Sequence, residues 1–444
     1  REMFPEMEIR QCGEAQDSME LLELPGISLD YLLKGLAGEE YRDDAVFQEL
    51  YSWYLQSPEY RTLVKRLTEV SFSERPSDMI GKTVAGILYG EVSPYSATRL
   101  ERFAACAFAH FLQYGLKVTE RAEYEFRAMD MGNVMHMALE KFAAEVRKEG
   151  LDWADLTEEE RNRIIDDCLD QVSADYGNTV LKSSARNEYM IERTRRILRR
   201  TVWALQEQLK HGEFRPEGFE VKFEGGRIDR VDIMEEPEKN RVYVKVIDYK
   251  TGNTSFDMLA LYHGLQLQLM IYLDGALKVE QRKYPDREIV PAGIFYYNVK
   301  DPMIQEKIHA DVERVQDQVM KKLKMNGLVQ ADDDVSIKID ETLASIPVSR
   351  NKDGSFSRRS SVASRQQFNA LGEYVRRKIC DIRESILDGN AAVAPYELGK
   401  KNACTYCPYI TVCGFDRKIP GYEFHRLPSF SESDLWKKIM KEDE

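Results

Sequence analysis

Cysteine is scarce in this sequence and unevenly placed. Its 444 residues include 7 cysteines, of which Cys12, Cys168 and Cys380 are isolated. A secreted domain that depended on disulfides would carry many cysteines at regular spacings. A disulfide scaffold is therefore excluded.

Long apolar runs are lacking as well. No window offers the roughly 18 uninterrupted apolar residues of a membrane-spanning helix. The N-terminal residues do not follow the basic, apolar, small-residue order of a signal peptide. We therefore expect a cytoplasmic protein with no membrane partner. Because the chain opens without an initiator methionine, we also expect it to be part of a longer protein.

Positive charge is in deficit, with 63 Lys and Arg against 76 Asp and Glu and a net charge of -13. Bulk coating of DNA is excluded, because neutralising phosphates requires clustered Lys and Arg, so any contact with nucleic acid must be local. The one biased stretch, Ser345 to Arg365, is rich in serine and arginine. Its Arg358 and Arg359 are candidates for binding a DNA strand, although a solvated loop is at least as good an interpretation. Arg230, open between a structural role and a phosphate contact, joins them.

A phosphate-binding loop is missing too. Gly81-Lys82-Thr83 resembles the end of such a loop, but Pro76 stands where the required earlier glycine would be. Because a nucleotide needs a Gly-rich cradle of backbone N–H groups, we expect no nucleotide site here.

Hydrophobic periodicity predicts the elements that are present. We expect helices from the N-cap Ser96 through Cys106 to Phe108, after Gly132, over 160–210, over 259–277, and over 368–387, where Gly389 ends the last one. In the helix after Gly132 the buried stripe is Met135, Leu139, Phe142 and Val146. His136 lies beside this stripe. We expect strands over 219–233, 241–249 and 289–299, so the fold class is α/β.

A carboxylate and a lysine meet at the end of one expected strand. The alternation over 241–249 puts Asp248 and Lys250 on one face, because side chains at i and i+2 point the same way. A hairpin through the polar turn over 235–240 would bring Asp229 to Asp248. Carboxylates hold hard cations such as Mg²⁺, which activate the water that attacks a phosphodiester, and Lys250 would orient or deprotonate that water. Glu220, upstream on the same run as Asp229, is a candidate for holding a second ion or a water.

These residues stand in a series of motifs. The sequence contains, in this order, Gly132-Asn133-Val134-Met135-His136, Glu220-x-x-Phe223, Gly226-Arg227-Ile228-Asp229-Arg230-Val231-Asp232, Val246-Ile247-Asp248-Tyr249-Lys250-Thr251-Gly252 and Gly264-x-x-x-Gln268-x-x-x-Tyr272. Their order and spacing resemble the RecB-like branch of the PD-(D/E)XK nucleases. The resemblance implies a restriction-endonuclease-like core, in which helices flank a mixed central sheet, with an additional helical N-terminal segment.

The resemblance also implies a role for each matching position. It makes His136, Asp229 and Asp248 ligands of Mg²⁺ or Mn²⁺. It makes Lys250 the catalytic base or water-orienting group. It makes Gln268 and Tyr272 a substrate-positioning pair one helical turn apart. The alternatives are a satisfied structural histidine and a pair that only packs the helix.

Three cysteines, Cys404, Cys407 and Cys413, fall within ten residues. A closed metal site needs a fourth ligand. Cys106 is the better candidate by its place in the first helix of the same unit, and Cys380 is the competing one.

A second resemblance concerns these cysteines. The sequence carries Ser96-x-x-Arg99-Leu100-Glu101-x-Phe103-x-x-Cys106-x-Phe108-x-x-Phe111 before the nuclease motifs and Cys413-Gly414-Phe415-Asp416 after them. Over roughly residues 91–425, this looks like the C-terminal nuclease domain of the AddB family. The resemblance implies a 4Fe-4S cluster held by Cys106, Cys404, Cys407 and Cys413. Zinc and reduced thiols are the alternatives. One departure is Ala107 in place of a proline, which removes no ligand.

The AddB family supplies the second subunit of the AddAB helicase-nuclease. The resemblance implies a nuclease that acts in double-strand break processing and recombinational repair. It would cleave single-stranded DNA, of the 5'-ended strand, which the partner AddA unwinds from a duplex end. Residues 1–90 would be a helical remnant of a helicase-like region, 91–425 the nuclease domain with its cysteine clasp, and 426–444 a C-terminal tail. A stand-alone RecB-like iron-sulfur exonuclease and a catalytically idle DNA-binding scaffold are the alternatives.

Overall fold

The computed structural model divides the chain between Ser77 and Asp78 into two units. It describes residues 28–29, 32–33, 35–36, 45–71, 78–90, 96–119, 128–176, 184–304, 311–332, 334–419 and 421–441, so that Cys12 lies outside the described residues. In the first unit, helices α2 (Ala45–Gln56) and α3 (Arg61–Ser71) pack around a small apolar core of Leu32, Leu36, Phe47, Tyr54 and Val64.

A mixed six-stranded sheet forms the centre of the second unit, with strand order β1-β2-β3-β4-β5-β6. The strands are β1 (Arg215–Phe223), β2 (Gly226–Glu236), β3 (Arg241–Lys250), β4 (Glu288–Asn298), β5 (Asn326–Gln330) and β6 (Val362–Ala363). β1, β2 and β3 are antiparallel neighbours, β4 runs parallel to β3, β5 antiparallel to β4, and β6 parallel to β5. The expected α/β class with a mixed sheet is confirmed.

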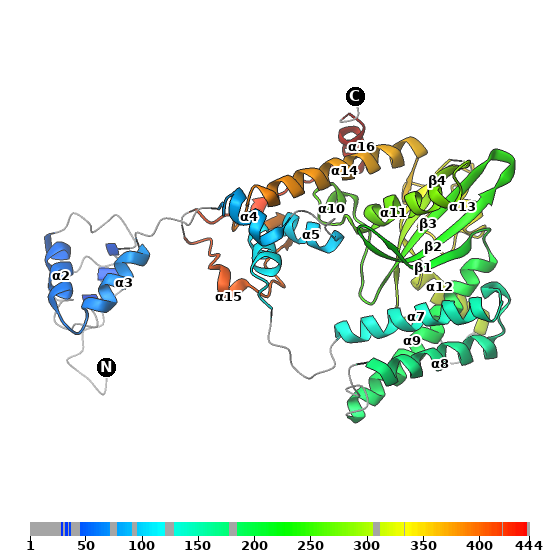
Figure 1. Cartoon of the computed structure of the whole chain (residues 1–444), viewed down its shortest axis with the longest axis horizontal. Coiled ribbons are helices and arrows are strands. Elements are labelled where there is room, and N and C mark those ends of the chain that lie inside the picture. The colour runs from blue at the N-terminus through cyan, green and yellow to red at the C-terminus, as the bar shows by residue number, and fades with distance from the viewer. Residues whose placement is uncertain are drawn as a thin grey trace, which may run out of the picture. The chain divides into compact units, whose positions relative to one another are not determined.

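Helices cover both faces of this sheet (Figure 1). One face packs on α7 (Ala128–Lys148), α8 (Glu158–Asp175) and α9 (Ala185–Lys210). The other packs on α5 (Ala97–Ala105), α11 (Gln268–Lys283), α14 (Arg365–Leu387) and α16 (Glu432–Lys441). β3 separates the two cores, because Val242, Val244 and Val246 face the second while Tyr243, Ile247 and Tyr249 face the first. The predicted alternation along this strand is therefore confirmed.

The remaining elements connect this framework. The short helices are α4 (Lys82–Tyr89), α6 (Ala107–His110), α10 (Met258–Tyr262), α12 (Val312–Lys322), α13 (Val335–Ile339) and α15 (Ile410–Cys413), with further turns over Phe111–Gly115, Trp153–Asp155 and Pro237–Lys239. A second sheet joins β7 (Tyr396–Leu398) to β8 (Lys401–Asn402) and β9 (His425–Arg426). Within the described parts of the chain, no helix combines the length and apolar character that crossing a bilayer requires.

Several predicted elements are broken in the structure. The run over 219–233 is two strands, because the chain turns at Glu224 and Gly225. The helix over 259–277 is two helices, α10 and α11, and Gly264 lies between them with a φ of 79°. The first helix does begin at the N-cap Ser96, but it ends before Cys106, whose extended backbone separates α5 from α6.

The predicted domain limits also differ from the structure. Residues 78–90 belong to the second unit, since the amide of Ile80 donates to the carbonyl oxygen of Gly389 over 2.8 Å. The approach is close: a Cβ at Gly389 would lie 2.7 Å from the backbone nitrogen of Gly81. The stretch 426–444 is not merely a tail, because α16 buries Leu435 and Ile439.

Candidate active site and cysteine site

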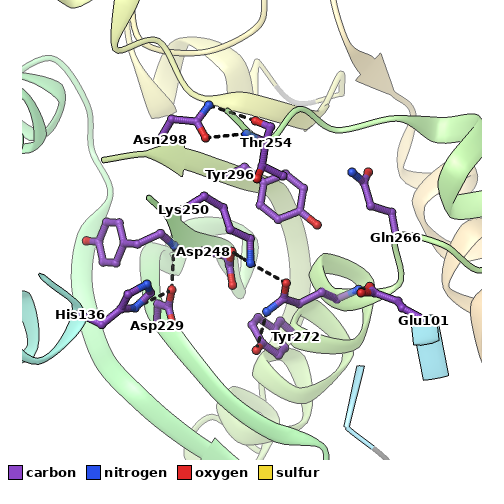
Figure 2. Close-up of polar contacts among 12 residues, drawn as sticks. Glu101, His136, Asp229, Asp248, Lys250, Thr254, Gln266, Tyr272, Tyr296 and Asn298 are labelled. Carbon is purple, nitrogen blue, oxygen red and sulfur yellow. Dashed lines mark hydrogen bonds and ion pairs between the residues drawn. The ribbon is translucent and has the colours of Figure 1, made fainter. Parts of the chain in front are cut away.

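The β2–β3 hairpin brings the two predicted carboxylates together. Arg230 pairs with Ile247 across the strands, which sets Asp229 beside the end of β3. One oxygen of Asp229 accepts a hydrogen bond of 2.7 Å from the backbone N–H of Tyr249, the residue after Asp248. Figure 2 shows Asp229 and Asp248 near one another, with His136 reaching Asp229 from α7. The expected hairpin is confirmed.

Lys250 is held from two sides. Its Nζ lies 2.7 Å from an oxygen of Asp248 on the same face of β3. It also donates to Oε1 of Gln268 over 2.7 Å. The amide nitrogen of Gln268 in turn donates to the hydroxyl of Tyr272, 2.8 Å away and one turn further along α11. The predicted pair of Gln268 and Tyr272 therefore touches the catalytic lysine as a short chain of hydrogen bonds.

A group of possible metal ligands lies beside this chain. Nδ1 of His136 is 3.4 Å from Oδ2 of Asp229. In the described part of the molecule, His136, Glu220 and Asp229 each offer a ligand atom, and these atoms lie within 4.8 Å of one another. One imidazole nitrogen with carboxylate oxygens suits Mg²⁺ or Mn²⁺. Asp248 stands outside this group, paired with Lys250, so its predicted role as a metal ligand stays a prediction.

The electrostatics of the group point the same way. Burial and the neighbouring Asp229 raise the pKa of Asp248 to about 7, against the lowering effect of Lys250. Burial and Asp229 likewise raise the pKa of Glu220 above its usual value. Burial lowers the pKa of His136, but Asp229, Asp248 and Glu220 together raise it above the ordinary range. The site therefore carries crowded negative charge, which a bound cation would relieve.

Glu220 reaches the site through an unusual backbone conformation. Its φ is +48°, in the left-handed region that non-glycine residues rarely adopt. Its carboxylate lies 2.6 Å from Nε of Arg227 across the β1–β2 pair. Strained backbone of this kind persists where the surroundings enforce it and is common at functional sites. The prediction placed Glu220 and Asp229 on one strand, whereas the structure delivers them from two.

Arg230 does not bind nucleic acid in this structure. Its side chain is 1% exposed, and its guanidinium donates to both oxygens of Asp232 over 2.6 and 2.9 Å. The rings of Trp153 and Phe219 lie 5.3 and 5.7 Å from the guanidinium carbon. The predicted phosphate contact is therefore wrong. Arg230 belongs to the core beneath the hairpin.

The basic stretch over 345–365 is partly used within the fold. Arg350 lies 3.3 Å from Asp334, and Arg365 forms an ion pair with Glu288. Arg358 and Arg359 are exposed. Their contact with a DNA strand stays a prediction.

Four cysteines line one cavity in the second unit: Cys106, Cys404, Cys407 and Cys413. Cys106 comes from the break between α5 and α6, and the other three from the loop that ends in α15. Burial raises the pKa of the Cys404 thiol to about 11, and it raises that of Cys106 as well. Cys380 is exposed on α14 and does not line this cavity. Geometry thus selects Cys106 over Cys380 as the fourth cysteine.

Sequence reasoning gave no role to Glu101, which the structure places at the edge of the site (Figure 2). Its Oε1 accepts from the backbone N–H groups of Leu267 and Gln268 over 2.7 and 2.9 Å. Glu101 stood within the motif that ends at Cys106, but local sequence carries no signal for a partner 166 residues away.

The sheet and its carboxylate-lysine hairpin define a class of protein. This chain belongs to the PD-(D/E)XK nuclease superfamily, whose family model matches residues 94–414.

Curated relatives extend the similarity to the whole chain. The chain is 38% identical over 464 residues to an ATP-dependent helicase/deoxyribonuclease subunit of Lachnoclostridium phytofermentans, a match that covers 100% of this chain and 40% of that protein. It is 33% identical over 475 residues to the subunit of the same name in Alkaliphilus metalliredigens, covering 100% of this chain and 41% of that protein. The expected resemblance to AddB-type proteins is confirmed. The chain spans about two fifths of the length of these relatives.

Proposed function

We propose that this chain is the nuclease part of a helicase-nuclease subunit and that it hydrolyses phosphodiester bonds of DNA with the help of a divalent cation. The carrying observation is the convergence of His136, Glu220 and Asp229 beside the ion pair of Asp248 and Lys250. The similarity to proteins named deoxyribonuclease subunits supports DNA as the substrate.

The residues divide the work of hydrolysis between them. His136, Glu220 and Asp229 would hold Mg²⁺ or Mn²⁺, with Asp248 as the further carboxylate that the resemblance assigns. When bound, such an ion lowers the pKa of a water and neutralises charge on the phosphate. Lys250 is fixed between two acceptors and is oriented to hold or deprotonate the attacking water.

Gln268 and Tyr272 supply the remaining polar surface. Because the hydroxyl of Tyr272 accepts from Gln268, its own proton is available to a phosphate oxygen. The pair thus supports the lysine and offers a donor to substrate at once. This arrangement suits a strand positioned by its backbone.

The whole assembly is proposed by similarity. We propose that the substrate is single-stranded DNA unwound from a duplex end by an AddA-type partner, that the 5'-ended strand is the one cleaved, and that the reaction serves double-strand break repair in the cytoplasm. Arg358 and Arg359 would contact the strand locally, as an acidic protein requires.

We further propose that the four cysteines hold a 4Fe-4S cluster. All four line one cavity, yet no three of their sulfur atoms, all within the described residues, lie within 4.8 Å of one another. A single tetrahedral zinc ion, with Zn–S bonds of about 2.3 Å, needs sulfurs about 3.8 Å apart. The wider spacing supports a cluster over one zinc ion.

The test is cleavage of end-labelled single-stranded DNA by the full chain in Mg²⁺, beside Lys250→Ala and the control Lys278→Ala. Lys278 is an exposed lysine on α11 that pairs with Asp274, away from the hairpin. We expect the parent and Lys278→Ala to cleave, and Lys250→Ala to lose at least about 100-fold in rate. Equal cleavage by all three would contradict the assigned lysine. Binding without cleavage by the parent would favour the idle scaffold.

A further inference from the structure

Helix α11 begins without a cap of its own. The first N–H groups of a helix have no partner inside it and need one from elsewhere. The N-cap residue Leu267 makes no side-chain cap hydrogen bond. The carboxylate of Glu101 fills this place: one oxygen, Oε1, accepts from the amides of both Leu267 and Gln268. A negative group at a helix N-terminus is also favoured by the helix dipole.

The residue whose backbone Glu101 holds is the one that touches the catalytic lysine. Gln268 accepts from Nζ of Lys250 with its side chain while its amide donates to Glu101. An unbroken path therefore runs from Glu101 through the first residue of α11 to Lys250. Figure 2 shows Glu101 approaching this end of the site from the opposite side to His136.

The other end of the path is anchored in the core and at the cysteine site. Glu101 lies on α5 between Leu100 and Phe103, which are 1% and 9% exposed. The same helix ends at Cys106, one of the four clustered cysteines. The position of α5 thus sets the position of the carboxylate.

A carboxylate here is costly, which argues that it has a task. Burial raises the pKa of Glu101 to about 7, although the two backbone N–H groups and Lys250 lower it. A glutamine or an apolar side chain would avoid that cost.

We propose that Glu101 is a positioning residue that fixes the start of α11, and through Gln268 the ammonium of Lys250, on the helix that ends at Cys106. This inference rests on the proposed nuclease function. A rival role is that its charge acts directly on Lys250. The two roles separate in Glu101→Gln, because an amide oxygen can accept the same two hydrogen bonds without the charge.

The experiment measures kcat and KM on an end-labelled single-stranded oligonucleotide in Mg²⁺ for the full chain and its variants. Glu101→Ala removes the acceptor, and Glu101→Asp retracts it by one methylene. We expect both to lower kcat by roughly 10- to 100-fold with KM within about threefold, because the lysine is misplaced while the DNA surface is kept. Glu101→Gln should keep kcat within about threefold of the parent. Glu384→Ala removes an exposed carboxylate on α14 and should leave both constants unchanged.

Hydrogen exchange of the amides of Leu267 and Gln268 gives a second readout that needs no activity. We expect faster exchange in Glu101→Ala than in the parent and near-parental exchange in Glu101→Gln. Unchanged kcat and exchange in Glu101→Ala would overturn the proposal, and so would an equal loss of kcat in Glu101→Gln. The glutamine variant keeps the test decisive if the alanine variant fails to fold. If the parent cleaves no DNA, the proposed function fails, and the exchange of the two amides alone decides whether Glu101 fixes the start of α11.

Discussion

Asp232 is the residue on which two buried cations depend. It is fully buried and pairs with both Arg230 and Lys245, whose Nζ lies 2.9 Å away. Asp232→Asn keeps the shape and removes the charge, so we expect the free energy of unfolding to fall by about 3–5 kcal/mol. Urea unfolding measures this. Asp381→Asn, at an exposed position on α14, should change it by less than about 0.5 kcal/mol. Similar losses in both variants would contradict the assignment.

The same carboxylate predicts a sign for acid unfolding. Burial raises the pKa of Asp232, but Arg230 and Lys245 outweigh this and hold it below the ordinary 3.8. The stabilisation is therefore present above the unfolded pKa and is lost as the pH falls through the lower folded value. The parent should lose stability over this acid range, and Asp232→Asn should lose less.

At the scale of elements, packing between α11 and β1 gives a sharp contrast between two helical glycines. A Cβ at Gly275 would lie 2.6 Å from the ring of Phe223, which packs edge-on against Tyr272. Gly275→Ala should therefore destabilise the protein by about 1–3 kcal/mol and displace Tyr272. On α14, a Cβ at Gly372 meets only the far end of Arg376 at 3.6 Å. Gly372→Ala should stabilise by about 0.5–1 kcal/mol. Thermal unfolding of both variants tests the pair, and a change of the same sign in both would refute it.

The elements also show how far sequence alone reaches. β3 was predictable because its period-2 pattern is local, and that pattern places Asp248 and Lys250 on one face. The breaks at Glu224 and Gly264 were not, because apolar periodicity continues across both turns and tertiary packing decides where the chain bends. The burial of Arg230 was hidden for the same reason, since its partners Trp153 and Phe219 come from other elements.

At the scale of the whole second unit, the cysteine site joins the two ends of the nuclease region. α5 and α6 precede the sheet, while the loop carrying Cys404, Cys407 and Cys413 follows α14. The two ends also touch directly, since the amide of Phe108 donates to the carbonyl oxygen of Ala392 over 3.0 Å. A cross-link that closes so long a loop contributes about 2–4 kcal/mol.

Replacing Cys407 by serine should therefore remove iron and sulfide from the purified chain, lower the unfolding temperature and speed hydrogen exchange at Leu267 and Gln268, because α5 loses its anchor. Cys380→Ser alters a thiol outside the cavity and should match the parent in metal content, stability and exchange. Stoichiometric zinc in place of iron in the parent would contradict the cluster. Loss of iron with parental exchange at both amides would show that the cysteine site and the catalytic lysine are mechanically independent. Loss of iron together with faster exchange would connect the two ends of the domain to the position of Lys250.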